Sequence, residues 1–151
     1  MNDLLTRQRV RDFLTAFYAG DAAALERCCA EDFDSITYAP IELFPHLGQH
    51  RGRQWAREAI RVQQQRYSDR RAEITFMAVE NDTAATMVRV ALQKRKDRRV
   101  VQIEIADFFT LRDGLIVTHR SFFDSFDLVQ QVLGHDLTDA FAARVQDAMR
   151  I

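Results

Sequence analysis

The 151-residue chain is poor in cysteine and in net charge, and each shortage excludes a class of protein. Its only two cysteines, Cys28 and Cys29, are adjacent, and on a helix they would point about 100° apart. They are poorly placed to bridge each other, so we interpret them as small buried side chains rather than as a disulfide. The formal charge of −1 gives no general reason to expect nucleic acid or an anionic membrane as a partner.

Long apolar runs, repeats and linkers are also missing from the sequence. No apolar stretch approaches the roughly 20 residues that span a bilayer, and residues 1–13 carry charges where a signal peptide has its apolar centre. We therefore expect a cytoplasmic protein without membrane contact. Since no low-complexity tract or composition shift divides the chain, we expect one domain over residues 1–134, with residues 135–151 as a helical extension of it.

Apolar residues at helical spacing predict three helices in the first half of the chain. The first covers residues 4–19 and ends at Gly20, after which Asp21 caps a second helix over residues 22–30. The third covers residues 52–67. A further helix is predicted after Asp136, and its apolar stripe consists of Leu137, Phe141, Val145 and Met149. A stripe of this width needs a surface to cover, and we expect either a lid over a pocket or a strap on a partner subunit.

Strand patterns begin at residues 34–39 and then dominate the chain from residue 71 onward. Alternating runs over residues 71–80, 83–94, 99–111 and 115–124 predict four successive strands, whereas residues 41–51 read as a loop with two histidines. Helices that come first and antiparallel strands that follow favour an α+β fold over an α/β fold.

The last two strands carry the most informative pattern. Asp113-Gly114 joins them as a hairpin, and alternation places side chains on one common face of the sheet. On that face we predict Ile103, Ile105, Asp107, Phe109 and Leu111 from the first strand, and Val117, His119, Ser121 and Phe123 from the second. A carboxylate that alternates with isoleucine and phenylalanine is either neutralised inside a core or part of a site.

Four segments together resemble the nuclear-transport-factor-2-like superfamily, and within it the SnoaL-like branch of polyketide cyclases, ketosteroid isomerases and limonene epoxide hydrolases. The segments are FLTAFYAGDAAALERCCAEDF, HRGRQWAREAI, ADFFTLRDGLI and THRSFFDSFDLVQQVLG. The resemblance implies a cone, in which a curved antiparallel sheet wraps around the three N-terminal helices and leaves a deep apolar cavity. It also implies a homodimer through the outer face of the sheet. Activity varies widely on this scaffold, so the fold alone does not give the reaction.

For each reaction of the family, the resemblance finds only part of the catalytic residue set in this chain. Asp107 matches the position where ketosteroid isomerases hold a protonated aspartic acid that donates to an oxyanion. Their tyrosine falls at Phe13 and their general base near residues 37–39, so neither role transfers. The aspartate that acts on water in the epoxide hydrolases matches Ser121, and SnoaL-type cyclases also have an aspartate there. The pocket tryptophan of the epoxide hydrolases matches His119, and their Arg-x-Asp pair matches Arg89 and Ala91.

His119 is the best candidate for a general acid or base, because an imidazole titrates near neutrality and Asp107 on the neighbouring strand can orient it. The alternative is a hydrogen-bonded histidine of the core. The resemblance also turns Arg89 and Met87 inward, where Arg89 is either an anchor for an anionic ligand or a self-satisfied partner of Asp107. The remaining residues predicted to bind the substrate are Ser121, Phe123, Phe17, Trp55, Ile105 and Phe109.

We expect no metal and no cofactor. The four histidines lack the fixed spacing of zinc sites, and the arginines beside Trp55 are interrupted by Glu58, as in a solvated face rather than a nucleic-acid site. The first hypothesis is therefore an enzyme that acts on a hydrophobic carbonyl compound as a hydrolase, isomerase or cyclase, with Asp107 and His119 exchanging protons. The second is a non-catalytic binding or dimeric assembly domain that has lost the aspartate at Ser121.

If Arg89 faces the cavity, alternation predicts an outward patch for the homodimer. Its members would be Val88, Val90, Leu92, Gln102, Glu104 and Phe108.

Overall fold

The computed structural model describes residues 2–150 and shows an α+β fold, as predicted. The helices are α1 (Asp3–Ala19), α2 (Ala22–Cys28), α3 (Trp55–Arg66), α4 (Ser125–Leu133) and α5 (Thr138–Met149). The strands are β1 (Cys29–Tyr38), β2 (Gly48–Arg51), β3 (Tyr67–Glu80), β4 (Thr83–Lys94), β5 (Val100–Arg112) and β6 (Leu115–Phe122). Among the described residues, no helix combines the length and the apolar character needed to cross a membrane.

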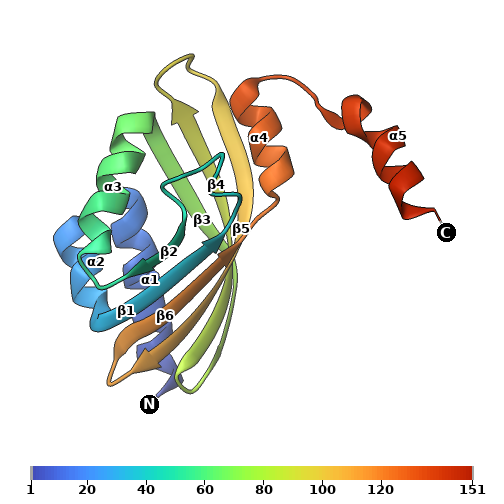
Figure 1. Cartoon of the computed structure of the whole chain (residues 1–151). Coiled ribbons are helices and arrows are strands. Elements are labelled where there is room, and N and C mark those ends of the chain that lie inside the picture. The colour runs from blue at the N-terminus through green and yellow to red at the C-terminus, as the bar shows by residue number, and fades with distance from the viewer. Residues whose placement is uncertain (1, 151) are drawn as a thin grey trace.

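One curved sheet of six strands carries the fold, in the order β2-β1-β6-β5-β4-β3. Helices α1, α2 and α3 lie against one face of the sheet, which we call the inner face, and α4 packs at its upper end (Figure 1). The predicted cone is therefore confirmed. One detail differs, because β1 and β6 pair in parallel while the other neighbours are antiparallel.

The helix boundaries follow local signals in the sequence. Gly20 ends α1 in the left-handed region with φ 79°, and its amide donates to the carbonyls of Ala16 and Phe17. The carboxylate of Asp21 then caps α2 by accepting from the amide of Ala24 at 3.0 Å, as predicted. Helix α2 ends at Cys28, two residues earlier than its pattern indicates, because Cys29 already pairs with Ile116 of β6.

The segment predicted as a loop contains the edge strand β2, which pairs with residues 34–37 of β1. This prediction was wrong because the strand is only four residues long and its partner lies about fifteen residues back in the chain, so no local pattern marks it. The remainder, residues 41–47, is irregular, and Phe44 at its centre is buried.

Strand β6 contains a bulge at Val117. Thr110 of β5 lies opposite Thr118, whereas its neighbour Leu111 lies opposite Ile116, so Val117 has no counterpart on β5. The predicted alternation therefore holds from His119 to Phe123 but not at Val117. The extra residue allows both Ile116 and His119 to face the interior.

The inner and outer faces of strand β4 are the reverse of those predicted from the sequence. Val88, Val90 and Leu92 are buried on the inner face, whereas Arg89 is exposed on the outer face. The predicted outward patch of valines and leucine was therefore wrong. The exposed outer face instead carries aromatic side chains from four strands, Tyr38, Phe76, Phe108 and Phe122. We call these four residues the outer aromatic face.

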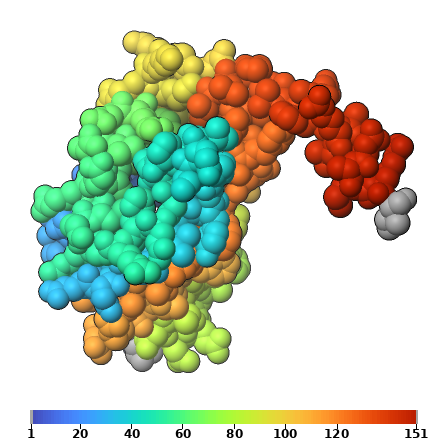
Figure 2. Space-filling model, in the orientation of Figure 1, coloured from blue at the N-terminus to red at the C-terminus, as the bar shows by residue number. Residues whose placement is uncertain are grey.

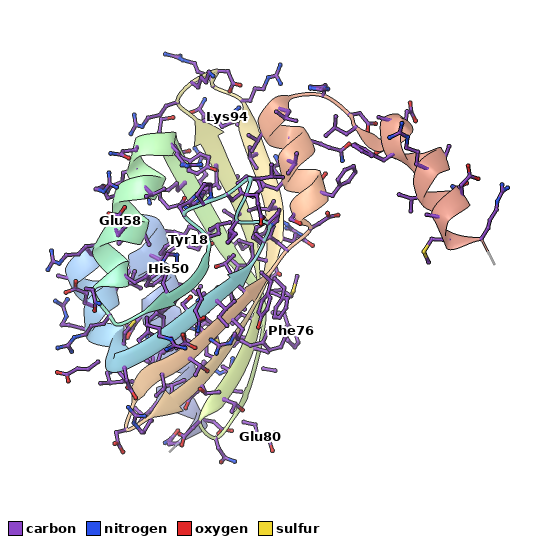
Figure 3. The ribbon with its side chains drawn as sticks, in the orientation of Figure 1. Tyr18, His50, Glu58, Phe76, Glu80 and Lys94 are labelled. Carbon is purple, nitrogen blue, oxygen red and sulfur yellow. The ribbon has the colours of Figure 1, made fainter. Side chains whose placement is uncertain are left out.

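The outer aromatic face is continuous across β1, β6 and β5. The rings of Tyr38 and Phe122 stack with centroids 4.4 Å apart, and Phe108 meets Phe122 edge-on at 5.9 Å. Phe76 of β3 projects on the same side, away from the helices (Figure 3). The opposite side of the sheet forms the core with α1 and α2, where Cys28 and Cys29 are buried as predicted and are free thiols.

Helix α4 begins at a capping residue, since Asp124 accepts from the amide of Asp127 at 3.0 Å. Helix α5 lies clear of the sheet (Figures 1 and 2). The ring of Phe141 on α5 meets that of Phe126 on α4 with centroids 6.2 Å apart, while Val145 and Met149 are exposed. Nothing from residues 135–150 lines the cavity described below, so within the described chain α5 does not act as a lid.

Candidate functional site

A cavity of about 320 Å³ opens between the inner face of the sheet, α1, α3 and residues 40–47. Its sheet wall is apolar over β4 and β5, where Val90, Leu92, Ile103 and Ile105 face it. Figure 2 shows the chain before β2 lying against α3 on this side of the molecule. The cavity is large enough for a compact organic molecule.

Asp107 and His119 lie together on the cavity wall, as predicted from alternation. They come from neighbouring strands, and His119 Nε2 is 2.7 Å from Asp107 Oδ1. Asp107 is 3% exposed and His119 is 7% exposed, so water screens their interaction little. Buried polar groups of this kind are stable only when they are hydrogen-bonded.

Ser35 of β1 completes a buried chain of three polar side chains. Its Oγ lies 3.0 Å from His119 Nδ1, and Ser35 is 2% exposed. Parallel pairing of β1 with β6 places Ser35 directly beside His119. Asp107 and His119 face the cavity, whereas Ser35 lies behind the ring. Ser35 was not predicted from the sequence, where it is only one member of the alternating pattern Phe33, Ser35, Thr37.

Aromatic rings hold the imidazole of His119 in place. Phe109 stacks on it with centroids 5.0 Å apart, and Phe13 of α1 contacts it at 5.3 Å. Phe109 was predicted to bind the substrate, but it is fully buried against His119 and Phe13 and supports the site from behind. Phe13, at the position matched to the tyrosine of the ketosteroid isomerases, likewise packs against the His119 ring. It also lines the cavity.

Most of the other residues predicted to bind a substrate do line the cavity. These are Phe17, Trp55, Ile105, Ser121 and Phe123. The rings of Phe17 and Trp55 stack at 6.1 Å with planes 2° apart, forming a flat aromatic wall. Ser121 lies opposite Asp107 in the strand register.

Arg89 and Met87 are not brought to the site. Both project from the outer face of β4, and Arg89 pairs there with Glu104 at 3.4 Å and Glu73 at 3.7 Å. The predicted inward guanidinium was wrong, because the inner face of β4 is occupied by the bulkier apolar set of Val88, Val90 and Leu92. Arg89 therefore neither anchors a ligand in the cavity nor pairs with Asp107.

Tyr18 on α1 lines the cavity and was not predicted from the sequence. Burial, and then the negative charge of Asp107, raise the pKa of Tyr18 well above its ordinary value, while the nearby charge of Arg70 opposes them. The phenol therefore keeps its proton and is a hydrogen-bond donor on the cavity wall. Its position four residues after Leu14, another lining residue, is the helical signal that predicts the shared face.

The opposite part of the wall has a different polar character. His46 and His50 line the cavity from the β2 side, and His50 Nε2 is 3.0 Å from the carbonyl oxygen of His46. Figure 3 places His50 and Glu58 with Tyr18 on the helical side of the sheet. Among residues 2–150, no group of three or more His, Cys, Asp or Glu side chains is arranged to hold a metal ion.

Burial, reinforced by the charges of Arg66 and His50, lowers the pKa of His46 from 6.5 to about 4. The folded protein therefore holds this imidazole neutral at pH values where an unfolded chain would protonate it. A neutral imidazole has one donor and one acceptor nitrogen, so it can bind a neutral polar group.

Acid is expected to destabilise the protein through His46. Between pH 6.5 and about 4 the unfolded chain binds a proton at this residue and the folded chain does not, so the free energy of unfolding falls as the pH falls through that window. Partial exposure reduces the effect to on the order of 1–2 kcal/mol. Urea unfolding of the wild type and of His46→Gln at pH 7 and pH 5 measures it. An equal loss of stability in both proteins would assign the acid sensitivity to other groups.

Comparison with known proteins gives one family. A sequence profile of the SnoaL-like domain matches residues 10–119. A comparison with curated proteins found no match. The solved structure of a proposed isomerase from Rhodopseudomonas palustris is 27% identical to this chain. The match covers 86% of this chain and 97% of that chain, with a TM-score of 0.75.

More distant structures share the fold. An NTF2-like protein of unknown function from Burkholderia pseudomallei is 15% identical, with 87% of this chain and 98% of that chain covered and a TM-score of 0.77. An epoxide hydrolase of M. tuberculosis is 18% identical, with 93% and 98% covered and a TM-score of 0.71. At these identities the likeness establishes the common cone and leaves the chemistry to the residues of the site.

Proposed function

Because the chain belongs to the SnoaL-like family, whose domains bind small molecules, we propose that it is an enzyme that moves a proton at a carbon next to the carbonyl group of a hydrophobic compound. The resemblance to a proposed isomerase is compatible with this reaction class. The observation that carries the proposal is the bond between Asp107 and His119 on an otherwise apolar wall.

The hydrogen bonds give the three polar residues distinct roles. With His119 neutral and its proton on Nε2, the ring donates to Asp107 Oδ1, and its Nδ1 accepts from the hydroxyl of Ser35. Both ring nitrogens are then occupied. The second oxygen of Asp107, Oδ2, is therefore the group that we assign to the substrate, while His119 orients the carboxylate and Ser35 fixes the tautomer of His119.

The proposed step begins with Asp107 as an anion. Oδ2 takes a proton from the α-carbon, and the electron pair of the broken C–H bond moves through the carbon chain to the carbonyl oxygen, which gives an enolate. A proton delivered from Asp107 to the same carbon or to a conjugated one then restores the carboxylate. Return to the same carbon gives exchange when the proton on Asp107 has first been replaced from solvent, and delivery to a conjugated carbon gives isomerisation.

The negative charge that develops on the carbonyl oxygen needs a donor. Tyr18 supplies one, since it lines the cavity, keeps its proton and is electrostatically coupled to Asp107. A donor that is already fixed in an apolar cavity stabilises an oxyanion more than water does, because it needs no reorientation during the reaction.

Ser121 favours the alternative of a binding domain without catalysis. It stands opposite Asp107, where the cyclases and epoxide hydrolases of the family have an aspartate, and a serine hydroxyl cannot activate water as a carboxylate does. In this alternative the cavity binds the same hydrophobic compounds and leaves them unchanged.

Proton exchange in D₂O separates the two functions. The probe is 4-phenylcyclohexanone, a rod-shaped apolar ketone, and NMR follows the loss of its α-proton signal. Binding is measured separately by quenching of Trp55, which is the only tryptophan and lies on the cavity wall. Binding with accelerated exchange supports the enzyme, whereas binding with exchange at the buffer rate supports the binding domain.

Tyr18→Phe is expected to slow the exchange of 4-phenylcyclohexanone by about 100-fold, because the enolate oxygen loses its donor. The ring and its packing remain, so the melting temperature should change little. The NMR exchange rate of this variant is compared with that of the wild type at saturating ketone. An unchanged rate would show that another group stabilises the enolate.

A further inference from the structure

Two unpartnered polar atoms belong to residues that line the cavity. The Nδ1 of His46 and the Oε1 of Gln63 are both buried, and neither has a hydrogen-bond partner among residues 2–150. Both residues line the cavity. A buried polar atom without a partner costs free energy, so a site that keeps two of them is suited to a ligand that satisfies both.

The two residues are held at one end of the cavity by separate elements. Gln63 lies one helical turn before Arg66 on α3, and the charge of Arg66 acts on His46, which places His46 beside the same end of the helix. The bond between His50 and the His46 carbonyl fixes the backbone on the other side. Phe44 packs edge-on against the His46 ring at 6.4 Å.

This end is distant from Asp107 along the sheet. Asp107 lies opposite Thr86 of β4, whereas the amide of Arg95, just after β4, donates to the carbonyl of Arg66 at the end of α3. Gln63, one turn before Arg66, therefore lies nearer to the Arg95 end of β4 than Asp107 does. The wall between them carries Val90, Leu92 and Ile103. The cavity thus has one polar position near Asp107, an apolar middle and a second polar position near Gln63.

The chemistry of the second position selects the ligand group. A cation is disfavoured because it would be buried beside Arg66, and an anion would meet the carbonyl oxygen of Gln63. A neutral hydroxyl fits both atoms, since its hydrogen can bond to Gln63 Oε1 while its oxygen accepts from His46, or its hydrogen is shared between the two.

We infer that the natural ligand is an elongated apolar carbonyl compound with a hydroxyl group at its far end, which His46 and Gln63 bind. This inference rests on the proposed function for the carbonyl end of the ligand. It adds a specificity site that neither Asp107 nor His119 provides.

The test compares three ligands that differ at one end. 4-(4-Hydroxyphenyl)cyclohexanone carries the hydroxyl, 4-phenylcyclohexanone lacks it, and 4-(4-methoxyphenyl)cyclohexanone replaces it with a group that cannot donate. Quenching of Trp55 gives the three affinities. We expect the hydroxyl compound to bind about 10-fold more tightly than either of the others.

Variants locate the source of that ratio. Gln63→Leu removes the acceptor at similar size. In this variant the ratio of the affinities for the hydroxyl compound and for 4-phenylcyclohexanone should fall to near one. The matched control Gln65→Leu makes the same change on the exposed side of α3 and should keep the wild-type ratio. A wild-type ratio near one, or a ratio that survives in Gln63→Leu, would overturn the inference.

Failure of the proposed function gives a different result. If the hydroxyl compound binds more tightly and exchange stays at the buffer rate, the proton transfer is refuted and the hydroxyl site stands. If all three ketones exchange rapidly with equal affinity, the hydroxyl site alone is refuted. If none of them quenches Trp55, the cavity does not accept this class of compound, and both proposals fall.

Discussion

Replacing Asp107 with asparagine is expected to slow the α-proton exchange of 4-phenylcyclohexanone by about 1,000-fold. The amide is close in shape to the carboxylate but cannot take a proton from carbon. Its amide oxygen can still accept from His119 Nε2, which leaves the NH₂ group in place of Oδ2. The variant thus keeps the contact with His119 and loses the base.

The measurement is the NMR exchange rate, with quenching of Trp55 as a control that the ketone still binds. Ser35→Ala is the matched comparison, because Ser35 lies behind His119 and does not reach the cavity. It should slow exchange far less than Asp107→Asn, while it lowers the free energy of unfolding by about 1–3 kcal/mol through the unpaired nitrogen of His119. Wild-type exchange in Asp107→Asn would remove Asp107 as the base.

A lysine in place of Phe108 is expected to convert a homodimer into monomers. We propose that two copies pair through the outer aromatic face, which leaves four large rings exposed in the isolated chain, with Phe108 at 47% exposure. An isologous contact between two such faces would bury more than about 1,000 Å² and needs no second protein. The lysine would place an unpaired charge at the centre of that contact.

Sedimentation at micromolar concentration measures the change. Leu5→Lys makes the same kind of substitution at an exposed apolar residue of α1, on the helical side, and should leave the dimer intact. Val90→Lys provides the contrast, because Val90 is 1% exposed on the cavity wall and a lysine there should destabilise the fold rather than split the dimer. A wild-type protein that sediments as a monomer would contradict the proposed interface.

Alternation predicted the faces of β5 and of the end of β6 correctly, because Asp107 and His119 stand among residues whose size and polarity differ sharply between the two faces. The faces of β4 were predicted wrongly because the family resemblance, and not alternation, turned Arg89 inward. Alternation separates Arg89 from Val88 and Val90, and polarity by itself favours burial of the valine face. Cross-strand register agrees with polarity, since Val88 lies opposite Ile105 and Val90 opposite Ile103 on the inner face.

The polar partners that sequence reasoning missed are all non-local. Ser35 meets His119 across 84 positions of chain through a parallel strand pair, which no local pattern encodes. His46 lies in irregular chain whose course is fixed by Phe44 and by the bond from His50. Gln63 sits on a helix that is polar on most of its surface, so its position on the cavity wall becomes visible only when α3 is packed against the sheet.

The bulge at Val117 adds to β6 one residue that has no counterpart on β5. Loss of this residue would leave Ile116 opposite Leu111 and Thr118 opposite Thr110, so His119 and Ser121 would stay on the inner face by ordinary alternation. A relative without the bulge would therefore keep the same wall with a strand that is one residue shorter. An alignment with such a relative needs a one-residue gap at Val117, because without it the positions before the bulge would be compared with residues of the opposite face.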